Sequence, residues 1–381
     1  MKLTDREWKE FNFIDIFIIK GGFYNKKPPM EYGGNIPFLG AVDNNNGITE
    51  FYTLHNIATN SKVGYGKNEP LSQKIYQGNC ICVTNNGSVG YAYYQKHIFT
   101  CSHDINPLYL KDVTLTENLA MFLISAIEQQ KMCFKYSRKW RPKRMRKSKI
   151  LLPVNKNKKP DYQFMEDYVK EIMHRKRQEY IDYAQKILAG GGKQILIKPL
   201  ISKKWKAFKI SDIFEIFAGK RLENKNQIIG NIPFIGATDS NNGITNFVSN
   251  KNTSFDNNVL GINYNGSVCE AFYHPYKCIF SDDVKRLHLK NSRNTENVLL
   301  FFSSIIKKQK EKYRYAYKFN TERMKKQYIM LPVDDKGNPD YEYMEYYTQN
   351  KMLAKYKDYL QYMECVSNMS SRVLNPFGSR I

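Results

Sequence analysis

Two long stretches of the chain repeat apolar residues at intervals of three and four, one after Pro160 and the other after Pro339. This spacing places the apolar side chains on one face of an α-helix and predicts two helices of about 27 residues each. The glycines at 190–192 would end the first helix, because glycine readily adopts the backbone conformation that closes a helix. The candidates for contacts with a partner helix or partner protein are Tyr168, Ile172, Tyr180 and Ile187 in the first stretch and Tyr347, Leu353, Tyr356 and Leu360 in the second.

Each apolar stripe has two possible uses. It can pack on the domain that precedes it, or the two helices can pack on each other. The helices are long for the first arrangement, and each stands at the end of its half of the chain. We therefore expect the two helices to pair, so that each covers the apolar stripe of the other.

Shorter patterns precede each long helix. Apolar runs bounded by Asn-Gly pairs predict short strands and turns. A threonine followed by glutamate and asparagine, at 116–118 and again at 295–297, predicts the start of a helix with the threonine hydroxyl as N-cap. The predicted strands include 80–84 and 259–263, and an amphipathic segment opens each half at 8–17 and 205–217.

The two halves are copies of one another. Trp8-Lys9-Glu10-Phe11 returns as Trp205-Lys206-Ala207-Phe208. The segment 36–41 returns at 232–237 with an offset of 196 residues, and from 86–89, which matches 265–268, the offset is 179. Two ordered copies of this length predict two domains with one scaffold.

The offset changes because the first copy is longer at one place. Thr49 and Asn86 are 37 positions apart, whereas Thr245 and Asn265 are 20 apart, an excess of 17. Matched segments around an unmatched one are typical of a common scaffold with different surface loops, and loops carry most binding functions. We therefore expect the two copies to bind different targets.

The charge of the chain narrows the class of partner. Lysine and arginine number 59 against 36 acidic residues, and the net charge is +23. So basic a protein attracts polyanions, so nucleic acid is the expected partner and an anionic membrane surface is the alternative. No apolar run reaches the roughly 18 residues of a membrane span, and the first residues lack the apolar core of a signal peptide. The seven cysteines suggest reduced thiols in a cytoplasm.

One segment concentrates this charge. Residues 131–149 hold ten lysines or arginines and no acidic residue, with Tyr136 and Trp140 among them. A run of one sign repels itself unless phosphates neutralise it, so we expect this segment and its weaker second copy to contact a DNA backbone. The candidates are Arg138, Lys139, Arg141, Lys143, Arg144, Arg146 and Lys147 in the first copy, and Lys318, Asn320, Arg323, Lys325 and Lys326 in the second, together with Lys220 and Arg221.

Two asparagine pairs are further candidates. Asn45-Asn46-Gly47 and Asn241-Asn242-Gly243 occupy equivalent places in the two copies. Asn-Gly is first of all a turn signal, and a role in the turn is the simpler interpretation. Asparagine can also read adenine through its side-chain amide. Asn45, Asn46, Asn241 and Asn242 are therefore kept as candidates for base contacts.

No catalytic motif accompanies these features. The chain lacks a Gly-rich phosphate loop, the Asn/Asp-Pro-Pro-aromatic motif of amino-methyltransferases, and the His and Cys spacing of a zinc site. We expect no catalytic residue, no metal site and no cofactor in this chain. The alternatives from other classes are a nucleic-acid-modifying enzyme with an unrecognised site, and an RNA-binding or scaffold protein with duplicated domains.

With these features the chain resembles the DNA specificity subunit of type I restriction–modification systems, and the similar recognition subunit of type IIB systems. The resemblance rests on the openings at Trp8 and Trp205, on the segments 83–90 and 263–268, and on 102–111 and 281–290, with a long helix after each copy. Each motif is weak alone, and two ordered copies are specific. Cys269 stands where the first copy has Gly90, which predicts a different geometry for the second turn.

The resemblance implies an α+β fold. Two α/β target-recognition domains would be held apart by two long helices that pack as an antiparallel coiled-coil spacer. The corresponding segments are 1–159 and 204–338 for the domains, 160–190 and 339–369 for the helices, 191–203 for a linker and 370–381 for a tail.

The resemblance also implies a division of labour. Each domain would read one half of a bipartite, asymmetric site in double-stranded DNA. Two methyltransferase subunits would dock near the spacer and flip an adenine in each half-site, and a restriction subunit or a fused methyltransferase–endonuclease would complete the complex. S-adenosylmethionine, Mg²⁺ and ATP would belong to these partners, and no membrane partner is expected.

Overall fold

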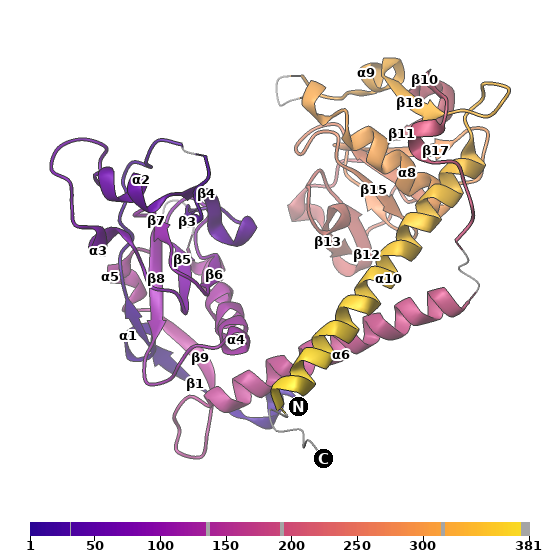
Figure 1. The fold of residues 1–381 in the computed structure, drawn as a ribbon. Coiled ribbons are helices and arrows are strands. Elements are labelled where there is room, and N and C mark those ends of the chain that lie inside the picture. The colour runs from indigo at the N-terminus through magenta and orange to yellow at the C-terminus, as the bar shows by residue number, and fades with distance from the viewer. Residues whose placement is uncertain (31, 135–137, 191–193, 314–316, 375–381) are drawn as a thin grey trace, which may run out of the picture. The chain divides into compact units, whose positions relative to one another are not determined.

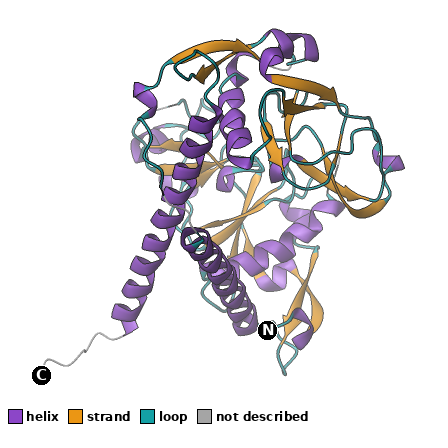
Figure 2. Ribbon diagram, turned by 90° about the vertical axis from the view of Figure 1, so that its right-hand side faces the viewer, coloured by secondary structure: helices purple, strands orange, loops and turns teal. Residues whose placement is uncertain are grey.

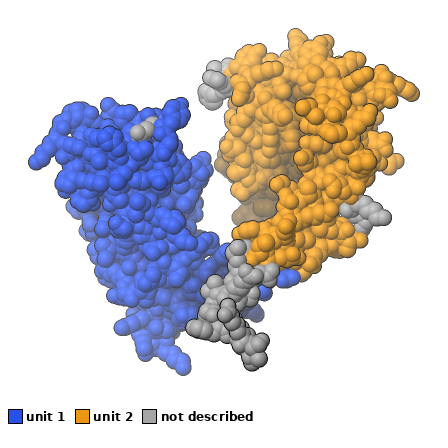
Figure 3. Space-filling model, in the orientation of Figure 1, with its two compact units in different colours: residues 1–179 blue, residues 180–381 orange. Residues whose placement is uncertain are grey.

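The computed structural model describes residues 1–30, 32–134, 138–190, 194–313 and 317–374. Tyr136 and the glycines at 191–192, which the sequence singled out, lie outside the described residues. The chain divides into two compact units, residues 1–179 and residues 180–381 (Figures 1 and 3). Strands and helices occur together in both units (Figure 2), as expected for the α+β class.

The described residues of unit 1 form three sheets. The first pairs β1 (Glu7–Asn12) with β9 (Lys149–Val154). The second is antiparallel and has the order β2 (Phe17–Ile19), β8 (Ile105–Leu110), β5 (Cys80–Thr84) and β6 (Ala92–Gln95). The third has the order β4 (Ile48–Tyr52), β3 (Ile36–Leu39) and β7 (Thr100–Cys101), with β3 and β7 parallel.

The central strand β5 separates two cores. Side chains alternate across a strand, so Ile81 and Val83 point to one side and Cys80 and Cys82 to the other, and all four are fully buried. Ile81 and Val83 join the larger core, which includes helix α4 (Glu117–Glu128). Cys80 and Cys82 join the core formed with β3, β4 and β7. The strand predicted at 80–84 is confirmed.

Unit 2 repeats this topology, and the strand predicted at 259–263 is confirmed. β10 (Trp205–Lys209) pairs with β18 (Tyr328–Pro332). The four-stranded sheet has the order β11 (Phe214–Ala218), β17 (Val284–Leu289), β14 (Val259–Asn263) and β15 (Ala271–His274). The three-stranded sheet has the order β13 (Ile244–Val248), β12 (Ile229–Ile235) and β16 (Ile279–Phe280), and α8 (Glu296–Lys307) is the counterpart of α4.

Short helices complete both units. The amphipathic openings of the two halves become a strand, one helical turn and a second strand, with the turns at α1 (Phe13–Ile16) and α7 (Ile210–Ile213). The other short α-helices of the described residues are α2 (Leu54–Thr59), α3 (Leu71–Lys74) and α5 (Pro142–Met145) in unit 1 and α9 (Thr321–Lys326) in unit 2.

The turn at Cys269 does not differ from the turn at Gly90, so this expectation is wrong. Both residues have a left-handed backbone, with φ of 84° at Gly90 and 63° at Cys269. Both backbone N–H groups also donate 2.9 Å hydrogen bonds to equivalent carbonyls, those of Thr84 and Asn263. A cysteine is strained in this conformation, and the surrounding ladder hydrogen bonds hold it there.

The two long helices predicted from the apolar periodicity are confirmed. α6 spans Tyr162–Ala189 and α10 spans Tyr341–Leu374. The carboxylates of Asp161 and Asp340 accept the N–H groups of Phe164 and Tyr343 at 3.1 and 3.0 Å and so cap the two helices. α10 runs past residue 369, where a tail was expected to begin. α6 belongs to both compact units, because the division falls at residues 179 and 180.

The first turns of each long helix pack on the domain before them. Glu166 of α6 accepts hydrogen bonds from Thr116, which also caps α4, and from Asn118 at 3.3 Å. Met165 is fully buried in the core of unit 1, and Tyr168 packs against that core. The counterparts in unit 2 are Glu345 with Thr295 and Asn297, and Met344 and Tyr347 in its core.

The end of α6 packs on α10 within unit 2. Ala184 is fully buried, Leu353 and Tyr356 are nearly so, and Leu360 packs against them. The ring of Tyr180 lies 6.3 Å from that of Tyr356, between ring centroids. The apolar stripe of each long helix therefore packs on its own domain in the first turns and on the other long helix further along. Tyr168 and Tyr347 pack on their own domains, Ile187 is exposed and Ile172 is half-buried. Contact of these residues with a partner stays a prediction.

Candidate DNA interface

Trp140 anchors the basic segment to the core of unit 1. Its ring is fully buried, stacks on Phe134 at 4.6 Å and meets Phe13 edge-on at 5.3 Å, both between ring centroids. The indole N–H donates to Ser148 Oγ at 2.9 Å. The aromatic residue among the basic ones is therefore part of the core, and it leaves the charged side chains around it on the surface.

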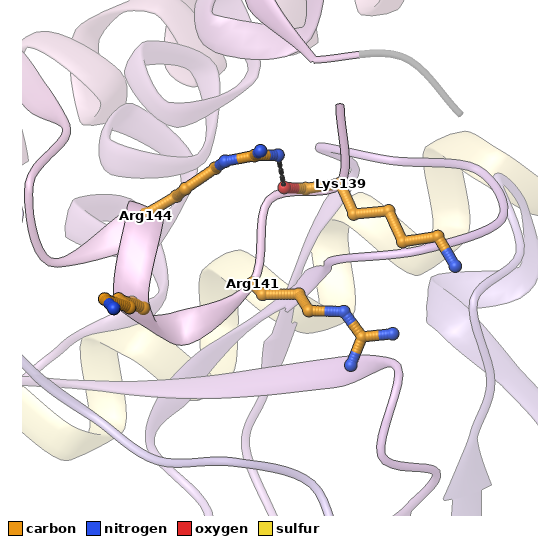
Figure 4. A pocket seen from close by; sticks show the side chains of 4 residues that line it. Lys139, Arg141 and Arg144 are labelled. Carbon is orange, nitrogen blue, oxygen red and sulfur yellow. Dashed lines mark hydrogen bonds between the residues drawn. The ribbon is translucent and has the colours of Figure 1, made fainter. Parts of the chain in front are cut away.

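Basic side chains surround a hollow beside α5. Lys139, Arg141, Lys143 and Arg144 line this hollow, which has a volume of about 380 Å³. The guanidinium of Arg144 donates to the backbone carbonyl of Lys139 at 2.9 Å, which holds the loop against the helix. The side chains of Lys139 and Arg141 extend away from α5 (Figure 4). A hollow whose described lining residues are all cations attracts a phosphate or another anion.

The charge of the basic segment is concentrated near α5. The lysines at the two ends of the basic segment are neutralised, because Lys131 pairs with Glu128 at 2.9 Å and Lys149 pairs with Glu10 at 2.8 Å. Arg146 and Lys147 follow α5 directly and are exposed. Within the described part of the chain, no carboxylate lies within 4.0 Å of the exposed basic side chains at Arg138, Arg141, Lys143, Arg144, Arg146 and Lys147.

The second copy has the same frame with less positive charge. Arg323 donates to the carbonyl of Lys318 at 2.8 Å, as Arg144 does to Lys139, and the buried Phe319 takes the place of Trp140. Asn320 caps α9 by accepting the N–H of Arg323 at 3.0 Å, which is a structural role. Lys325 pairs with Glu322 at 3.4 Å, and Lys326 beside it is exposed.

Lys220 and Arg221 lie in the loop after β11. Both are exposed. Arg221 pairs with Glu223 at 3.4 Å, and the same carboxylate pairs with Lys225 at 3.1 Å. The loop is therefore less positive than the sequence alone suggests.

The asparagine pairs form turns, as the simpler interpretation held. Asn45, Asn46, Asn241 and Asn242 all have positive φ between 49° and 52°. The side-chain amides of Asn45 and Asn46 donate to the carbonyls of Ile48 at 2.8 Å and Tyr94 at 3.1 Å. Asn242 donates to a backbone carbonyl of β15 in the same way, and Asn241 is exposed. Base contact by these residues stays a prediction.

The strongly shifted titratable groups lie in the cores, away from the basic surface. Burial lowers the pKa of His274 to about 4 and raises the pKa of the Cys269 thiol to about 12. Both shifts follow from packing in apolar surroundings. Among the described residues no three His, Cys, Asp or Glu side chains gather so that they could hold a metal ion, and none of the described helices is long and apolar enough to cross a bilayer.

One exposed feature was not among the predicted sites. Tyr65 is 76% exposed at the tip of the loop between α2 and α3, with Gly64 and Gly66 on either side. The signal that could have found it is an aromatic residue between two glycines, inside the stretch where the first copy has 17 additional residues.

Comparison with known proteins identifies the family. The model of the "Type I restriction modification DNA specificity domain" matches the chain twice, over residues 5–181 and 202–360. The "Type II restriction enzyme BgcI specificity subunit S.BcgI" of Heyndrickxia coagulans is 42% identical over 286 residues, which are 74% of this chain and 82% of that protein.

Solved structures with a lower level of similarity include two S subunits. The S subunit of a type I restriction–modification system from M. genitalium is 17% identical with a TM-score of 0.44, over 100% of this chain and 99% of that one. The HsdS subunit from Thermoanaerobacter tengcongensis is 10% identical with a TM-score of 0.30, over 95% and 91%. The two domain matches and the 42% identical relative show that the chain belongs to the type I restriction–modification DNA specificity family, as a specificity subunit with two recognition domains.

Proposed function

We propose that this chain binds double-stranded DNA as the non-catalytic subunit of its complex, and that each domain reads one half of a bipartite, asymmetric site. The observation that carries the proposal is the basic surface at α5, where Arg141, Lys143 and Arg144 line a hollow that has no acidic residue among its described lining. The same frame recurs at α9 in unit 2. The α9 surface is less positive because Glu322 lies among its basic residues. Two basic surfaces on one scaffold suit two contacts with a DNA backbone.

Differences between the two units support an asymmetric site. The segment between the fourth and fifth matched strands runs over 53–79 in unit 1 and over 249–258 in unit 2. The charges near α5 and α9 also differ, because Glu322 stands among the basic residues of α9. Identical readers would recognise two equal half-sites, whereas unlike readers recognise two different ones.

A spacer function for the long helices rests on their length and contacts. α6 has 28 residues and would be about 42 Å long at about 1.5 Å per residue. Its last turns pack on α10 through Ala184, Leu353 and Tyr356. We propose that α6 and α10 pair in antiparallel fashion and thereby fix the distance between the two half-sites.

Docking of two methyltransferase subunits is supported by a pair of equivalent grooves. In unit 1 a groove of about 630 Å³ is lined by Trp8, Phe122, Tyr168 and Ile172, among others. A smaller hollow of about 400 Å³ beside Trp205 in unit 2 is built from the matching elements. In this proposal S-adenosylmethionine, Mg²⁺ and any ATP bind to the partner subunits.

Methylome sequencing tests the proposed function. Cells would carry this chain with its methyltransferase, or either protein alone. We expect adenine methylation at one bipartite, asymmetric motif, only when both proteins are present. A palindromic motif, or methylation by the rigorously purified chain alone, would falsify the proposal. Competition between duplex DNA and structured RNA separates DNA recognition from RNA binding.

A further inference from the structure

The additional residues of the first copy build a separate element on unit 1. Between β4 and β5 the chain forms α2, a loop over 60–70, and α3, where unit 2 has only 249–258. α2 and α3 lie at the end of unit 1 that is opposite to β1 and β9 (Figure 1). α6 begins shortly after β9 in the chain. The element is therefore far from the helix that leaves the domain.

A buried ammonium group organises this element. Lys74 at the end of α3 is fully buried. Its Nζ donates to the backbone carbonyls of Ile57, Ala58 and Asn60 at 3.2, 3.0 and 2.8 Å, and to the side-chain oxygen of Asn68. A buried charge is costly unless it is hydrogen-bonded. Lys74 meets this condition by holding the end of α2 and the far side of the loop together.

Further hydrogen bonds make the loop rigid. The backbone N–H of Lys62 donates to Glu69 Oε2 at 3.0 Å, across the base of the loop. The carbonyl of Lys62 accepts the N–H groups of Asn25 and Lys26 at 3.0 and 3.2 Å. Asn68 donates through its side-chain amide to the Ala58 carbonyl at 2.7 Å. These hydrogen bonds hold the loop against the rest of unit 1.

The tip of the loop between α2 and α3 exposes one aromatic ring to solvent. Gly64 and Gly66 have φ of 83° and 80°, a conformation that other residues rarely adopt, and Tyr65 stands between them with 76% of its surface exposed. The hydroxyl of Ser61 donates to the Tyr65 carbonyl at 2.9 Å and fixes the tip.

Lysines lie in this loop and beside it. Lys62 and Lys67 belong to the same loop, and Lys67 is exposed. The stem of Lys26 passes so close to Gly64 that a Cβ there would be 2.9 Å from its Cδ. An exposed aromatic ring on a loop that carries lysines is suited to DNA, because lysines can contact phosphates while the ring contacts base edges. A rigid loop also loses little entropy on binding.

We propose that loop 61–69 enters a groove of the DNA half-site read by the first domain, with Tyr65 in contact with the bases and Lys74 as the residue that positions it. This inference rests on the proposed DNA recognition and adds which loop and which side chains determine one half of the specificity. The second domain lacks the loop, so the proposal applies to one half-site only.

The test uses the assembled complex of this chain and its methyltransferase. Methylation rates would be measured on duplexes that carry the recognised site, or the site with single base-pair substitutions at each position. We expect Tyr65→Ala to reduce discrimination about tenfold at one or two adjacent base pairs of a single half-site. Tyr65→Phe keeps the ring and should stay close to the unchanged protein.

Lys74→Met examines the positioning role. Methionine has a similar length but removes the hydrogen bonds to the loop, so we expect relaxed discrimination at the same base pairs as in Tyr65→Ala. A purely structural role would lower the amount of active complex equally for all duplexes, without a position-dependent effect. Tyr65→Ala remains decisive if Lys74→Met fails to fold, because Tyr65 is exposed.

The outcomes separate this inference from the proposed function. If the unchanged complex does not recognise a bipartite site, the proposed function is wrong. If it does, but Tyr65→Ala keeps full discrimination or alters both half-sites together, the proposed function stands and the role of the loop is overturned.

Discussion

At the scale of single residues, the anchor of the basic segment is an aromatic side chain. Trp140 fills the core beside Phe134 and Phe13, and Phe319 does so at the same place in unit 2. We expect Trp140→Ala to lower the free energy of unfolding of unit 1 by about 3–5 kcal/mol, because a large cavity is left behind. Trp140→Phe, which copies the second unit, should cost much less. Urea denaturation of both variants measures the difference, and equal stabilities would contradict the anchoring role.

Another residue-scale prediction concerns acid. His274 in β15 is fully buried, and burial lowers its pKa from 6.5 to about 4. Between these pH values the unfolded chain binds a proton that the folded chain does not, so the free energy of unfolding falls as the pH drops from 6.5 toward 4. The loss below pH 4 would be about 3 kcal/mol.

The matched variant for this effect is His274→Gln, because Gln95 occupies the equivalent place in unit 1. Urea denaturation at several pH values between 7 and 4.5 should show a smaller loss of stability for the variant than for the unchanged protein. Parallel curves for the two proteins would show that His274 is not the group responsible.

At the scale of elements, α5 should dominate the salt dependence of DNA binding. Each phosphate contact contributes about −0.9 to the slope of log binding constant against log salt concentration. Replacing Arg141, Arg144 and Arg146 by alanine should therefore flatten the slope by about two to three and weaken binding to all sequences alike. Titrations of the protein with duplex DNA at several salt concentrations measure the slope.

The control for that experiment carries the same change of charge on a different element. Arg175, Lys176 and Arg177 are exposed on α6, and the first two pair with Glu179. Their replacement by alanine should leave the slope of the isolated chain unchanged. If both triple variants flatten the slope equally, net charge rather than α5 determines binding.

Two aspartate substitutions in α6 distinguish its packing on α10 from its proposed role in docking the methyltransferase. Ala184 is fully buried against α10, so Ala184→Asp buries a charge and should destabilise unit 2 by about 3 kcal/mol or more. Ile172 is half-buried at the groove beside Trp8, so Ile172→Asp should keep the fold and lose the methyltransferase. Thermal unfolding and co-purification distinguish the two, and a normal complex with Ile172→Asp would exclude that groove as the docking place.

At the scale of the whole molecule, the proposed spacer predicts the length of the unread gap. A helix of about 42 Å corresponds to about 12 base pairs between the centres of the two readers. Four residues added to α6 and four to α10 should widen the gap by about two base pairs and keep both half-sites. Exchange of residues 1–159 with those of a relative should change one half-site only. Methylome sequencing measures both results. A gap of unchanged length would show that the helices do not set the distance between the half-sites.

Much of this architecture could be predicted from the sequence because it is periodic or repeated along the chain. The duplication, the strands at 80–84 and 259–263, the caps at Thr116 and Thr295, and the two long helices follow from local patterns, and the structure confirms them. The basic segment around α5 was also found this way, since a run of ten cations without an acid is a property of the sequence itself.

Only the tertiary structure decided which of these residues are available. Lys149 is neutralised by Glu10, 139 positions away in the chain, and Trp140 turns inward, whereas Arg141 and Arg144 stay outside. The helical stripes change partner along their length, because Tyr168 meets its own core and Ala184 meets α10. Lys74 becomes the centre of a loop by reaching carbonyls 14 to 17 positions away. Periodicity and composition are local properties of a chain, but burial and charge pairing depend on contacts between distant segments, and folding alone creates those contacts.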